Sequence, residues 1–329
     1  MAEHTAPPRV GRTPGRRVVI VTPAPRGSRA GNRTTALRWA ALLRQLGAQV
    51  RIVEAWHGEP CDVLVAVHAV KTAASVLAAA AALPTLRIVV LLAGTDVYPR
   101  FDPDAATLAA LQRADALVAL QRHGVETLPP PLRGKVRTIV QSAVGLPPHR
   151  HPPFRACVLA HLRPVKDPLL PVAALAHVPA DVPIELHLAG RALTPGMAAA
   201  AHAAMAADPR VRWLGELPRR RARELLASSH VCLVPSTSEG GANVVSEAIA
   251  AGTPVLATRI PGNLGLLGED WPGLFPVGDA HALGDLLVRA ATDDAFLRTL
   301  RDRTLALQPM VAPARERAAW QHLLADLFC

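Results

Sequence analysis

Residues 235–258 read PSTSEGGANVVSEAIAAGTPVLAT, and this stretch decides the fold. An apolar strand ends at Pro235, a loop with two adjacent glycines follows, and a helix begins near Asn243. A second apolar run over 254–257 predicts the next strand. Strand, helix and strand in this order form a crossover unit, which places two parallel strands in one sheet.

The same alternation extends in both directions along the chain. In the first half we expect strands over 17–22, 50–53, 63–67, 87–92, 116–120 and 136–140, with helices over 34–46, 72–83 and 104–113. In the second half we expect strands over 156–160, 184–189, 211–214, 231–234 and 254–257, with helices over 168–177, 198–207, 219–228, 244–251 and 280–292. Continuous apolar strands between helices are typical of parallel sheets covered on both faces. The fold class is therefore α/β.

The Pro-rich segment 145–153 interrupts this alternation and is predicted to be a linker. It separates a first Rossmann-like domain over 17–144 from a second over 154–308. Residues 1–16 are polar, lack the apolar core of a signal peptide, and are expected to form a disordered tail. Residues 309–329 contain an amphipathic helix that we expect to pack back toward the first domain. Two doubly wound domains that face each other leave a cleft at the carboxyl ends of their strands.

The composition narrows the function classes. The chain has 329 residues, is half hydrophobic, and carries 36 Lys and Arg against 26 Asp and Glu, a net charge of +10. A basic balance favours anionic partners. The arginine run 219–223 has no aromatic neighbours, so a solvated helix face explains it better than nucleic-acid binding. Apolar runs are too short to span a bilayer. We therefore expect a cytoplasmic protein without stable membrane association, for which a monomer is compatible with the sequence.

Two glutamates frame the loop and helix of the opening stretch. Glu239 and Glu247 have seven residues between them, and Glu247 falls early in the helix. An ordinary strand-to-helix turn, with Glu247 as a partner of the helix dipole, explains this spacing equally well. A helix N-terminus with glycines nearby also suits an anion or sugar hydroxyls. On that second interpretation the ligand-binding groups are Gly240, Gly241, Ala242, Asn243 and Glu247.

Two cations follow the first strand of the second domain. Arg163 and Lys166 lie three residues apart in the segment AHLRPVKDP, on a turn that enters a helix. A solvated helix start is the alternative, but two cations there oppose the helix dipole. Cations at the end of a strand suit an anionic ligand in the cleft.

Loops of the first domain offer candidates for the other wall of the cleft. They follow strands of the predicted sheet, so they reach its carboxyl edge. Ordinary hydrogen bonding within loops is the alternative explanation for each. The candidates for binding an acceptor are Gly31, Asn32, Arg33, His68, Lys71, Thr95 and Asp96.

Metal chemistry finds little support in the sequence. Asp102, Pro103 and Asp104 spell D-x-D, but Pro at this place favours a helix cap. The histidines show no paired metal-ligand spacing, and the four cysteines contain no CxxC pair. We expect no metal and no cofactor.

The stretch from Glu239 to Glu247 resembles the donor-binding signature of the GT-B glycosyltransferases related to glycogen and sucrose synthases. The resemblance implies that Glu239 and the amides after it hold the donor sugar, and that Glu247 binds the ribose hydroxyls. It also implies that Arg163 and Lys166 neutralise the leaving nucleotide diphosphate, and that Glu239, Arg163 and Lys166 carry the catalysis.

A closer resemblance covers nearly all of residues 17–329. The segments GTDVY, HLRPVK and 239–279 are similar to the selenosugar synthases of selenoneine biosynthesis, a branch of this family. The resemblance implies transfer of a sugar from UDP-N-acetylglucosamine or UDP-glucose to selenophosphate, with release of UDP and phosphate. An acceptor that is already anionic needs cations to hold it, and no general base. Lys71, Arg33 and His68 are expected to hold it.

One alternative shares the donor residues. A GT-B glycosyltransferase with a hydroxyl acceptor, on a glycan or a lipid, would use the same pair of glutamates and the same two cations. It predicts exposed aromatic residues or a basic amphipathic helix on the first domain. There, Trp39, Trp56, Tyr98 and Phe101 are scattered along the sequence.

Overall fold

The computed structural model describes residues 15–94, 96–98 and 100–329. The first of its two sheets is parallel throughout, in the order β2-β1-β3-β4-β5-β6. Its strands are β1 (Arg17–Val21), β2 (Gln49–Val53), β3 (Val63–Val67), β4 (Arg87–Leu92), β5 (Ala116–Ala119) and β6 (Val136–Thr138). The connecting helices are α1 (Gly31–Gln45), α2 (Ala69–Ala82), α3 (Ala105–Arg113), the short 3₁₀ helix η1 (Arg122–Val125) and α4 (Pro130–Arg133).

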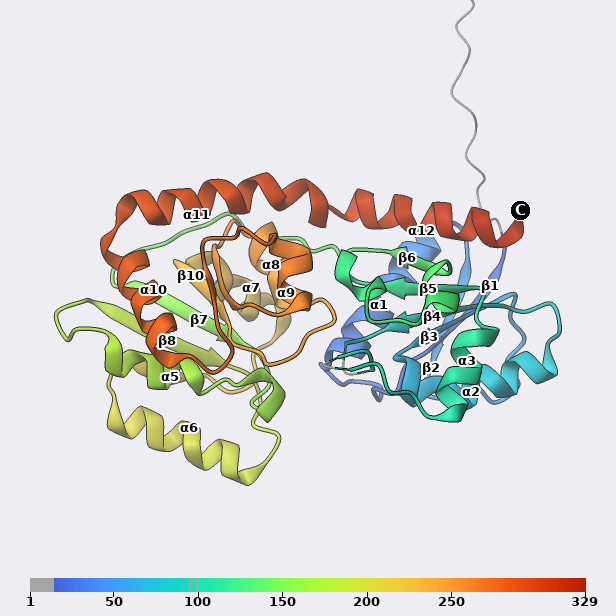
Figure 1. Ribbon diagram of the computed structural model, residues 1–329, viewed down its shortest axis with the longest axis horizontal. Helices are drawn as coiled ribbons and strands as arrows, with labels where there is room; N and C mark the ends of the chain where they lie inside the picture. Colours follow the sequence, from blue (N-terminus) through green and yellow to red (C-terminus); the bar gives the residue numbers. More distant parts are fainter. Residues whose placement is uncertain (1–14, 95, 99) are drawn as a thin grey trace, which may run out of the picture.

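The second sheet is also parallel and has the order β12-β11-β10-β7-β8-β9. Its strands are β7 (Phe154–Leu159), β8 (Ile184–Ala189), β9 (Val211–Trp213), β10 (Val231–Val234), β11 (Val255–Thr258) and β12 (Leu274–Phe275). Around it lie η2 (Pro164–Lys166), α5 (Leu170–Ala174), η3 (Leu175–His177), α6 (Pro195–Ala207), α7 (Arg219–Ser228), α8 (Asn243–Ala250), α9 (Pro261–Leu267), α10 (Ala280–Thr292) and α11 (Asp294–Leu307). Figure 1 shows the two domains side by side.

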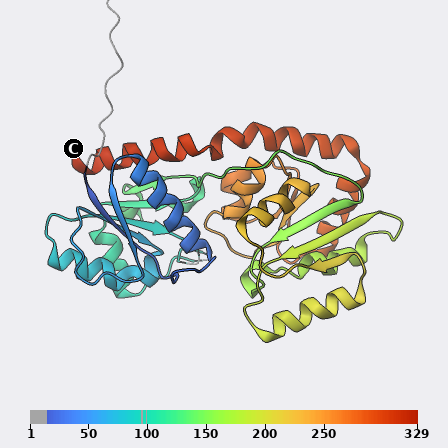
Figure 2. The same ribbon diagram turned by 180° about the vertical axis from the view of Figure 1, so that it is seen from behind.

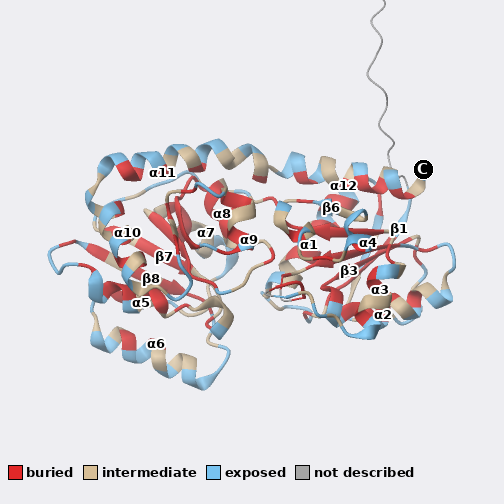
Figure 3. Cartoon of the chain, viewed as in Figure 1, coloured by how far each residue is buried: buried red, intermediate tan, exposed pale blue. Residues whose placement is uncertain are grey.

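The central strands form because their side chains are apolar on both faces. In β3, all five residues of VLVAV are buried, as four of the five are in β1. Figure 3 shows this burial along the middle of both sheets, with exposed residues on the outer surfaces of the helices. The two α/β domains expected from the sequence are thus confirmed, and both have helices on the two faces of a parallel sheet.

Strand order reverses once in each sheet, and these two places position the functional site. In the first sheet the chain moves outward from β1 to β2 and then returns to β3 on the other side of β1. In the second sheet the reversal lies between β7 and β10. Ligands of such folds bind beyond the carboxyl ends of the strands at this switch point. The loops that follow β1, β3, β7 and β10 are therefore the expected walls of a binding site.

The last helices connect the two domains. After α11 a 3₁₀ turn, η4 (Gln308–Val311), leads into α12 (Pro313–Phe328), and together they run along one side of both domains (Figure 1). Trp320 of α12 is fully buried and meets Trp39 of α1 edge to face, with ring centroids 4.8 Å apart. Its neighbours Leu323 and Leu324 join the same core cluster of the first sheet. This helix therefore completes the core of the first domain, although it follows the second in sequence.

Candidate functional site

A cavity of about 540 Å³ lies between the carboxyl ends of the two sheets. It is lined by the loops after β1, β3, β7 and β10, the strands that flank the two switch points. Its two walls come from different domains, and α1 points its N-terminal end at the second domain (Figure 2). A ligand held there touches residues that are far apart in the sequence.

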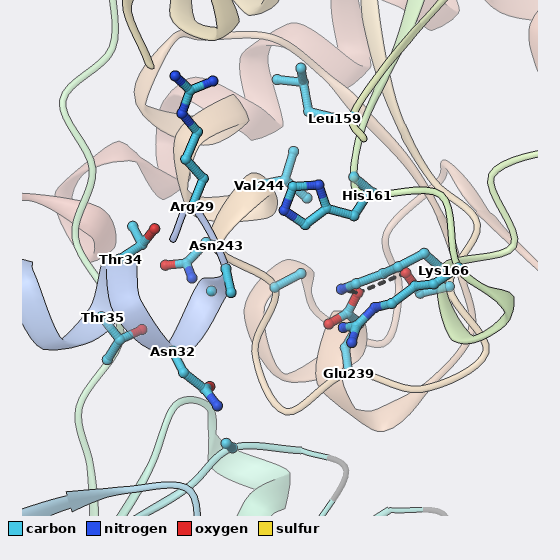
Figure 4. Close-up of a pocket in the computed structure, with 18 of the residues that line it drawn as sticks. Arg29, Asn32, Thr34, Thr35, Leu159, His161, Lys166, Glu239, Asn243 and Val244 are labelled. Carbon is cyan, nitrogen blue, oxygen red and sulfur yellow. Dashed lines mark hydrogen bonds and ion pairs between the residues drawn. The ribbon is translucent and has the colours of Figure 1, made fainter. Parts of the chain in front are cut away.

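The wall from the second domain carries the two predicted cations. Arg163 and Lys166 belong to the turn of η2 directly after β7, and both line the cavity. The ammonium of Lys166 forms an ion pair with the carboxylate of Glu239, which lies in the loop after β10. Ser236 donates a hydrogen bond of 2.7 Å to the same carboxylate. In Figure 4 Lys166 and Glu239 lie across the pocket from the residues of α1. Glu239 is thus held in place by two contacts from its own domain.

The N-terminal end of α8 also lines the cavity on the side of the second domain. Gly240, Gly241 and Ala242 lead into the helix, and the N-cap residue Ala242 has no side chain that could satisfy the first amides. These amides are therefore available to an anion or to hydroxyl oxygens. Glu247 lines the cavity one turn further along. Burial raises the pKa of its carboxyl, whereas the nearby guanidinium of Arg38 acts in the opposite direction.

The wall from the first domain is built by two helix starts. Gly31 and Asn32 open α1, whose N-cap residue Ala30 makes no side-chain cap bond, and both residues line the cavity. His68 and Lys71 lie at the start of α2 and also line it. His68 has a φ of 96°, a backbone conformation that costs energy for any residue other than glycine. Strain of this kind at a cavity is typical of a functional position.

The structure places two of the predicted acceptor residues outside the cavity lining. Among the described residues that line the cavity, neither Arg33 nor Asp96 is found. Asp96 is buried, and its carboxylate accepts hydrogen bonds from the backbone N–H groups of Ala69 (2.8 Å) and Ala93 (3.0 Å). The same oxygen lies 3.6 Å from Nδ1 of His68. Asp96 therefore fixes two loops beside the imidazole of His68. The prediction for Thr95 lies outside the described residues.

Several lining residues were not among the candidates predicted from the sequence. His161 and Arg191 follow β7 and β8, and Glu216 and Leu217 follow β9. Their position directly after a strand is a signal that could have found them. Arg38 and Glu316 also went unpredicted: Arg38 donates to Oδ1 of Asn243 at 3.0 Å and pairs with Glu316 at 3.4 Å. No local pattern marks a residue whose partner is 278 positions away.

The D-x-D sequence serves as a helix cap. Oδ1 of Asp104 accepts from the backbone N–H of Thr107 at 2.7 Å, at the start of α3. In the described part of the chain, no group of three or more His, Cys, Asp and Glu side chains could hold a metal ion. Within that same part, no helix has the length and apolar character needed to cross a bilayer.

Comparison with known proteins agrees with this geometry. Residues 154–293 match the family described as "Glycosyl transferases group 1". Over 118 residues, 36% of its length, the chain is 30% identical to the D-inositol 3-phosphate glycosyltransferase of Corynebacterium urealyticum. That match spans about a quarter (26%) of the length of this curated relative.

Solved structures extend the likeness to both domains. HepE of Anabaena, in complex with UDP-glucose, superposes with a TM-score of 0.75 at 16% identity, covering 94% of this chain and 100% of HepE. Sucrose-phosphate synthase from Thermosynechococcus elongatus gives a TM-score of 0.76 at 16% identity, covering 96% and 99%. A glycosyltransferase from Rickettsia africae gives 0.75 at 13% identity, covering 95% and 99%. The chain thus has the two-domain GT-B fold that the sequence predicts.

Proposed function

We propose that this glycosyltransferase moves a sugar from UDP-N-acetylglucosamine or UDP-glucose to selenophosphate, the reaction of the selenosugar synthases that its sequence resembles. One observation carries the proposal: both walls of a single cavity present groups that suit anions. Arg163 and Lys166 stand on the wall of the second domain, and Lys71 and the uncapped start of α1 stand on the opposite wall. A reaction between two polyanionic substrates needs this arrangement.

The donor half of the site follows from the chemistry of the leaving group. As the bond between C1 of the sugar and the diphosphate breaks, negative charge grows on the diphosphate, and Arg163 and Lys166 stabilise it. Glu239 and the amides before α8 hold the sugar, and Glu247 accepts from the ribose hydroxyls. A UDP-glucose complex of HepE and the sugar-transfer name of the curated relative support a UDP-sugar donor.

The acceptor half needs positive charge more than it needs a base. Selenium of selenophosphate is a soft nucleophile that is already anionic, so it attacks C1 without loss of a proton. The C–Se bond forms, and the electron pair of the broken C–O bond leaves with UDP. Water then cleaves the Se–P bond to give the selenosugar and phosphate. Lys71 and the start of α1 hold the phosphoryl oxygens while this happens.

One observation favours a second candidate, a hydroxyl acceptor on a glycan or a lipid. Nδ1 of His68 lies 3.6 Å from the carboxylate of Asp96, and an imidazole beside a carboxylate is a common general base. Burial lowers the pKa of His68, whereas the carboxylate of Asp96 raises it, and a neutral imidazole can accept a proton. Such a base would remove the proton of an acceptor hydroxyl. Selenophosphate has no proton that must be removed before it attacks, so it would not need the base.

The first experiment is an anaerobic incubation of the purified protein with UDP-N-acetylglucosamine and selenophosphate, followed by mass spectrometry. The proposal predicts a product with the selenium isotope pattern, formed in equal amount with UDP. UDP release without a selenium product would keep the donor site and discard the acceptor. Lys71→Ala should raise the KM for selenophosphate much more than the KM for the UDP-sugar, with Lys135→Ala, outside the cavity lining, as the control. Equal effects on both KM values would remove Lys71 from the acceptor site.

A further inference from the structure

One hydrogen bond joins the two domains at the acceptor end of the cleft. Arg38 of α1 donates from Nη2 to Oδ1 of Asn243, the first residue of α8, at 3.0 Å. The Arg38 side chain is 14% exposed, so this contact is shielded from water. A guanidinium has donors and no acceptor, so it fixes which end of the Asn243 amide it meets. The carbonyl oxygen must face Arg38, and the amide nitrogen must face away from it.

The amide nitrogen then lies at the start of α1. A Cβ on Gly31 would lie 3.7 Å from Nδ2 of Asn243, and both residues line the cavity. Figure 4 shows Asn243 beside the N-terminal turn of α1. Ala30 gives the first amides of α1 no side-chain cap. The Nδ2 donor of Asn243 therefore joins a group of backbone donors from the other domain.

A buried carboxylate holds Arg38 in this position. Glu316 of α12 has a side chain with no exposed surface and pairs with Arg38 at 3.4 Å. It also accepts from Nε1 of Trp39 and from the backbone N–H of Ser142, both at 2.8 Å. Burial lowers the pKa of Arg38 and the charge of Glu316 raises it. Because Glu316 neutralises the guanidinium, the charge of Arg38 contributes little attraction for a substrate, and its effect passes through Asn243.

From these contacts we infer that Arg38 is a positioning residue, which orients Asn243 so that its Nδ2 donates to the anionic group of the acceptor. The inference rests on the proposed function, because it takes the acceptor to be an anion at the start of α1. It assigns to Asn243, at the head of the donor helix, a task in binding the second substrate. It also explains why a helix from the far end of the chain is needed: α12 supplies the carboxylate that holds the arginine.

Asn243→Asp separates orientation from packing. The aspartate still accepts from Arg38, but the atom that faces α1 becomes a carboxylate oxygen in place of an N–H donor. We expect the KM for selenophosphate to rise at least about tenfold, since a charge-assisted hydrogen bond is replaced by repulsion. The affinity for UDP should stay within about twofold, because the donor contact assigned to Asn243 is its backbone N–H, which aspartate keeps.

Arg38→Met tests the positioning role itself. It keeps the volume of the side chain and removes the donor that orients Asn243. We expect the selenophosphate KM to rise about fivefold to tenfold with kcat little changed, and UDP affinity to change less, since Arg38 acts on the nucleotide site only through the charge of Glu247. In Asn243→Ala, which has no amide to orient, the further change Arg38→Met should add no acceptor effect. Arg44→Met is the matched control, because Arg44 lies on the same helix and its side chain donates to the backbone of Val50 at the surface.

Titration calorimetry with inorganic phosphate on the UDP-loaded protein gives a readout that does not depend on turnover. Phosphate binding that is weakened by Asn243→Asp and by Arg38→Met, and kept by Arg44→Met, supports the inference. Parallel changes in UDP and phosphate affinity would overturn it, because a structural role of Arg38 predicts them. Failure of the wild-type protein to bind phosphate would also overturn it. Selenosugar formation with unchanged acceptor KM in both variants would overturn the inference and leave the proposed function intact.

Discussion

Lys166 and Glu239 form an ion pair across the switch point of the second sheet, and Ser236 donates to the same carboxylate oxygen. The ammonium belongs to the turn after β7 and the carboxylate to the loop after β10. In this arrangement each group neutralises the other. A diphosphate carries more negative charge than one carboxylate, so under the proposed function it would compete with Glu239 for Lys166.

Glu239→Gln should uncouple nucleotide binding from sugar transfer. The amide keeps the size of the side chain and leaves Lys166 without its counter-ion, so UDP should bind at least as tightly as it does to the wild-type protein. Transfer should fall by about a hundredfold to a thousandfold, the usual effect of removing one group that stabilises a transition state. Calorimetry with UDP and steady-state rates measure the two effects. Glu185→Gln, in the ion pair with Arg155 outside the cavity lining, is the control. Near-normal turnover would sink the donor assignment.

Gly240→Ala should disturb the approach of the two domains. A Cβ on Gly240 would lie 2.5 Å from the backbone nitrogen of Gly94 and 2.6 Å from its Cα, in the loop after β4. Neither backbone segment can yield without moving its domain. We expect kcat to fall at least tenfold, since a misplacement of about 1 Å can cost a hundredfold in rate. UDP affinity should change little, because most donor contacts lie on one domain.

The control for that variant is Gly134→Ala. Gly134 has helical backbone angles, and a Cβ added there would meet no atom within 4 Å, so alanine should be harmless. Small-angle scattering on both variants reports whether the domains have moved apart. An active Gly240→Ala protein with the radius of gyration of the wild type would show that the loops can adjust, and that the contact with Gly94 does not set the closed arrangement.

Much of the fold could be predicted because its strands are unbroken apolar runs. Strand β12 and helix α9 were not predicted, because neither contains a long unbroken apolar run. Strand β12 has two residues, and α9 contains two glycines and is stabilised by its neighbours. Helix α1 begins at Gly31, before the predicted start at 34. The prediction missed the first turn because no side-chain cap marks it. For α11 a local signal is present: Asp293 accepts from the backbone N–H of Phe296, a capping pattern that could have predicted the helix start.

The residues of the site also fall into a group that the sequence predicts and a group that it does not. Glu239, Glu247, Arg163 and Lys166 belong to short motifs next to strands, so each could be named from the sequence. Their mutual contacts, such as the ion pair of Lys166 with Glu239, depend on which strands are neighbours in the sheet. No local sequence pattern specifies the order of the strands. Glu316 could not be predicted for a different reason. A charged residue on an amphipathic helix suggests a solvated face, and only the packing of α12 on α1 buries it.

His230 should make the stability of the second domain depend on pH. Burial, together with the guanidinium groups of Arg301 and Arg150, lowers the pKa of His230 to about 4. Its Nδ1 accepts from the backbone N–H of Arg155 at 3.0 Å, which requires the neutral ring. In the unfolded chain the pKa is the ordinary value of about 6.5. Stability from this group is therefore present above pH about 6.5 and is lost as the pH falls toward 4.

The variant His230→Asn isolates this contribution, because an amide oxygen can accept from Arg155 without titrating. Urea unfolding of both proteins at about pH 7.5 and about pH 5 should show a larger loss of stability in the wild type. The difference between the two losses measures the contribution of His230, since other histidines titrate alike in both proteins. Equal losses would mean that protonated His230 is tolerated in the folded state.

Glu316→Gln should destabilise the chain with almost no change in shape. The carboxylate accepts from Trp39, from Ser142 and from Arg38, and its side chain has no exposed surface. A glutamine offers one oxygen, so its amide nitrogen must face a donor, and the buried guanidinium loses its counter-charge. We expect a loss of about 3 kcal/mol in the free energy of unfolding, as for other buried pairs that lose one partner.

Glu224→Gln provides the contrast for that measurement, because Glu224 pairs with Arg220 and Arg221 on the surface of α7. Glu224→Gln should lower the free energy of unfolding by less than about 0.5 kcal/mol, since exposed ion pairs contribute little to stability. If Glu316→Gln were equally mild, the buried carboxylate would not be what fastens α12 to the first domain, and the apolar contact of Trp320 with Trp39 would have to hold it alone. In that case Trp320→Ala would lower the free energy of unfolding by more than Glu316→Gln does. A larger loss from Glu316→Gln than from Trp320→Ala would mean that the polar network holds the helix in place.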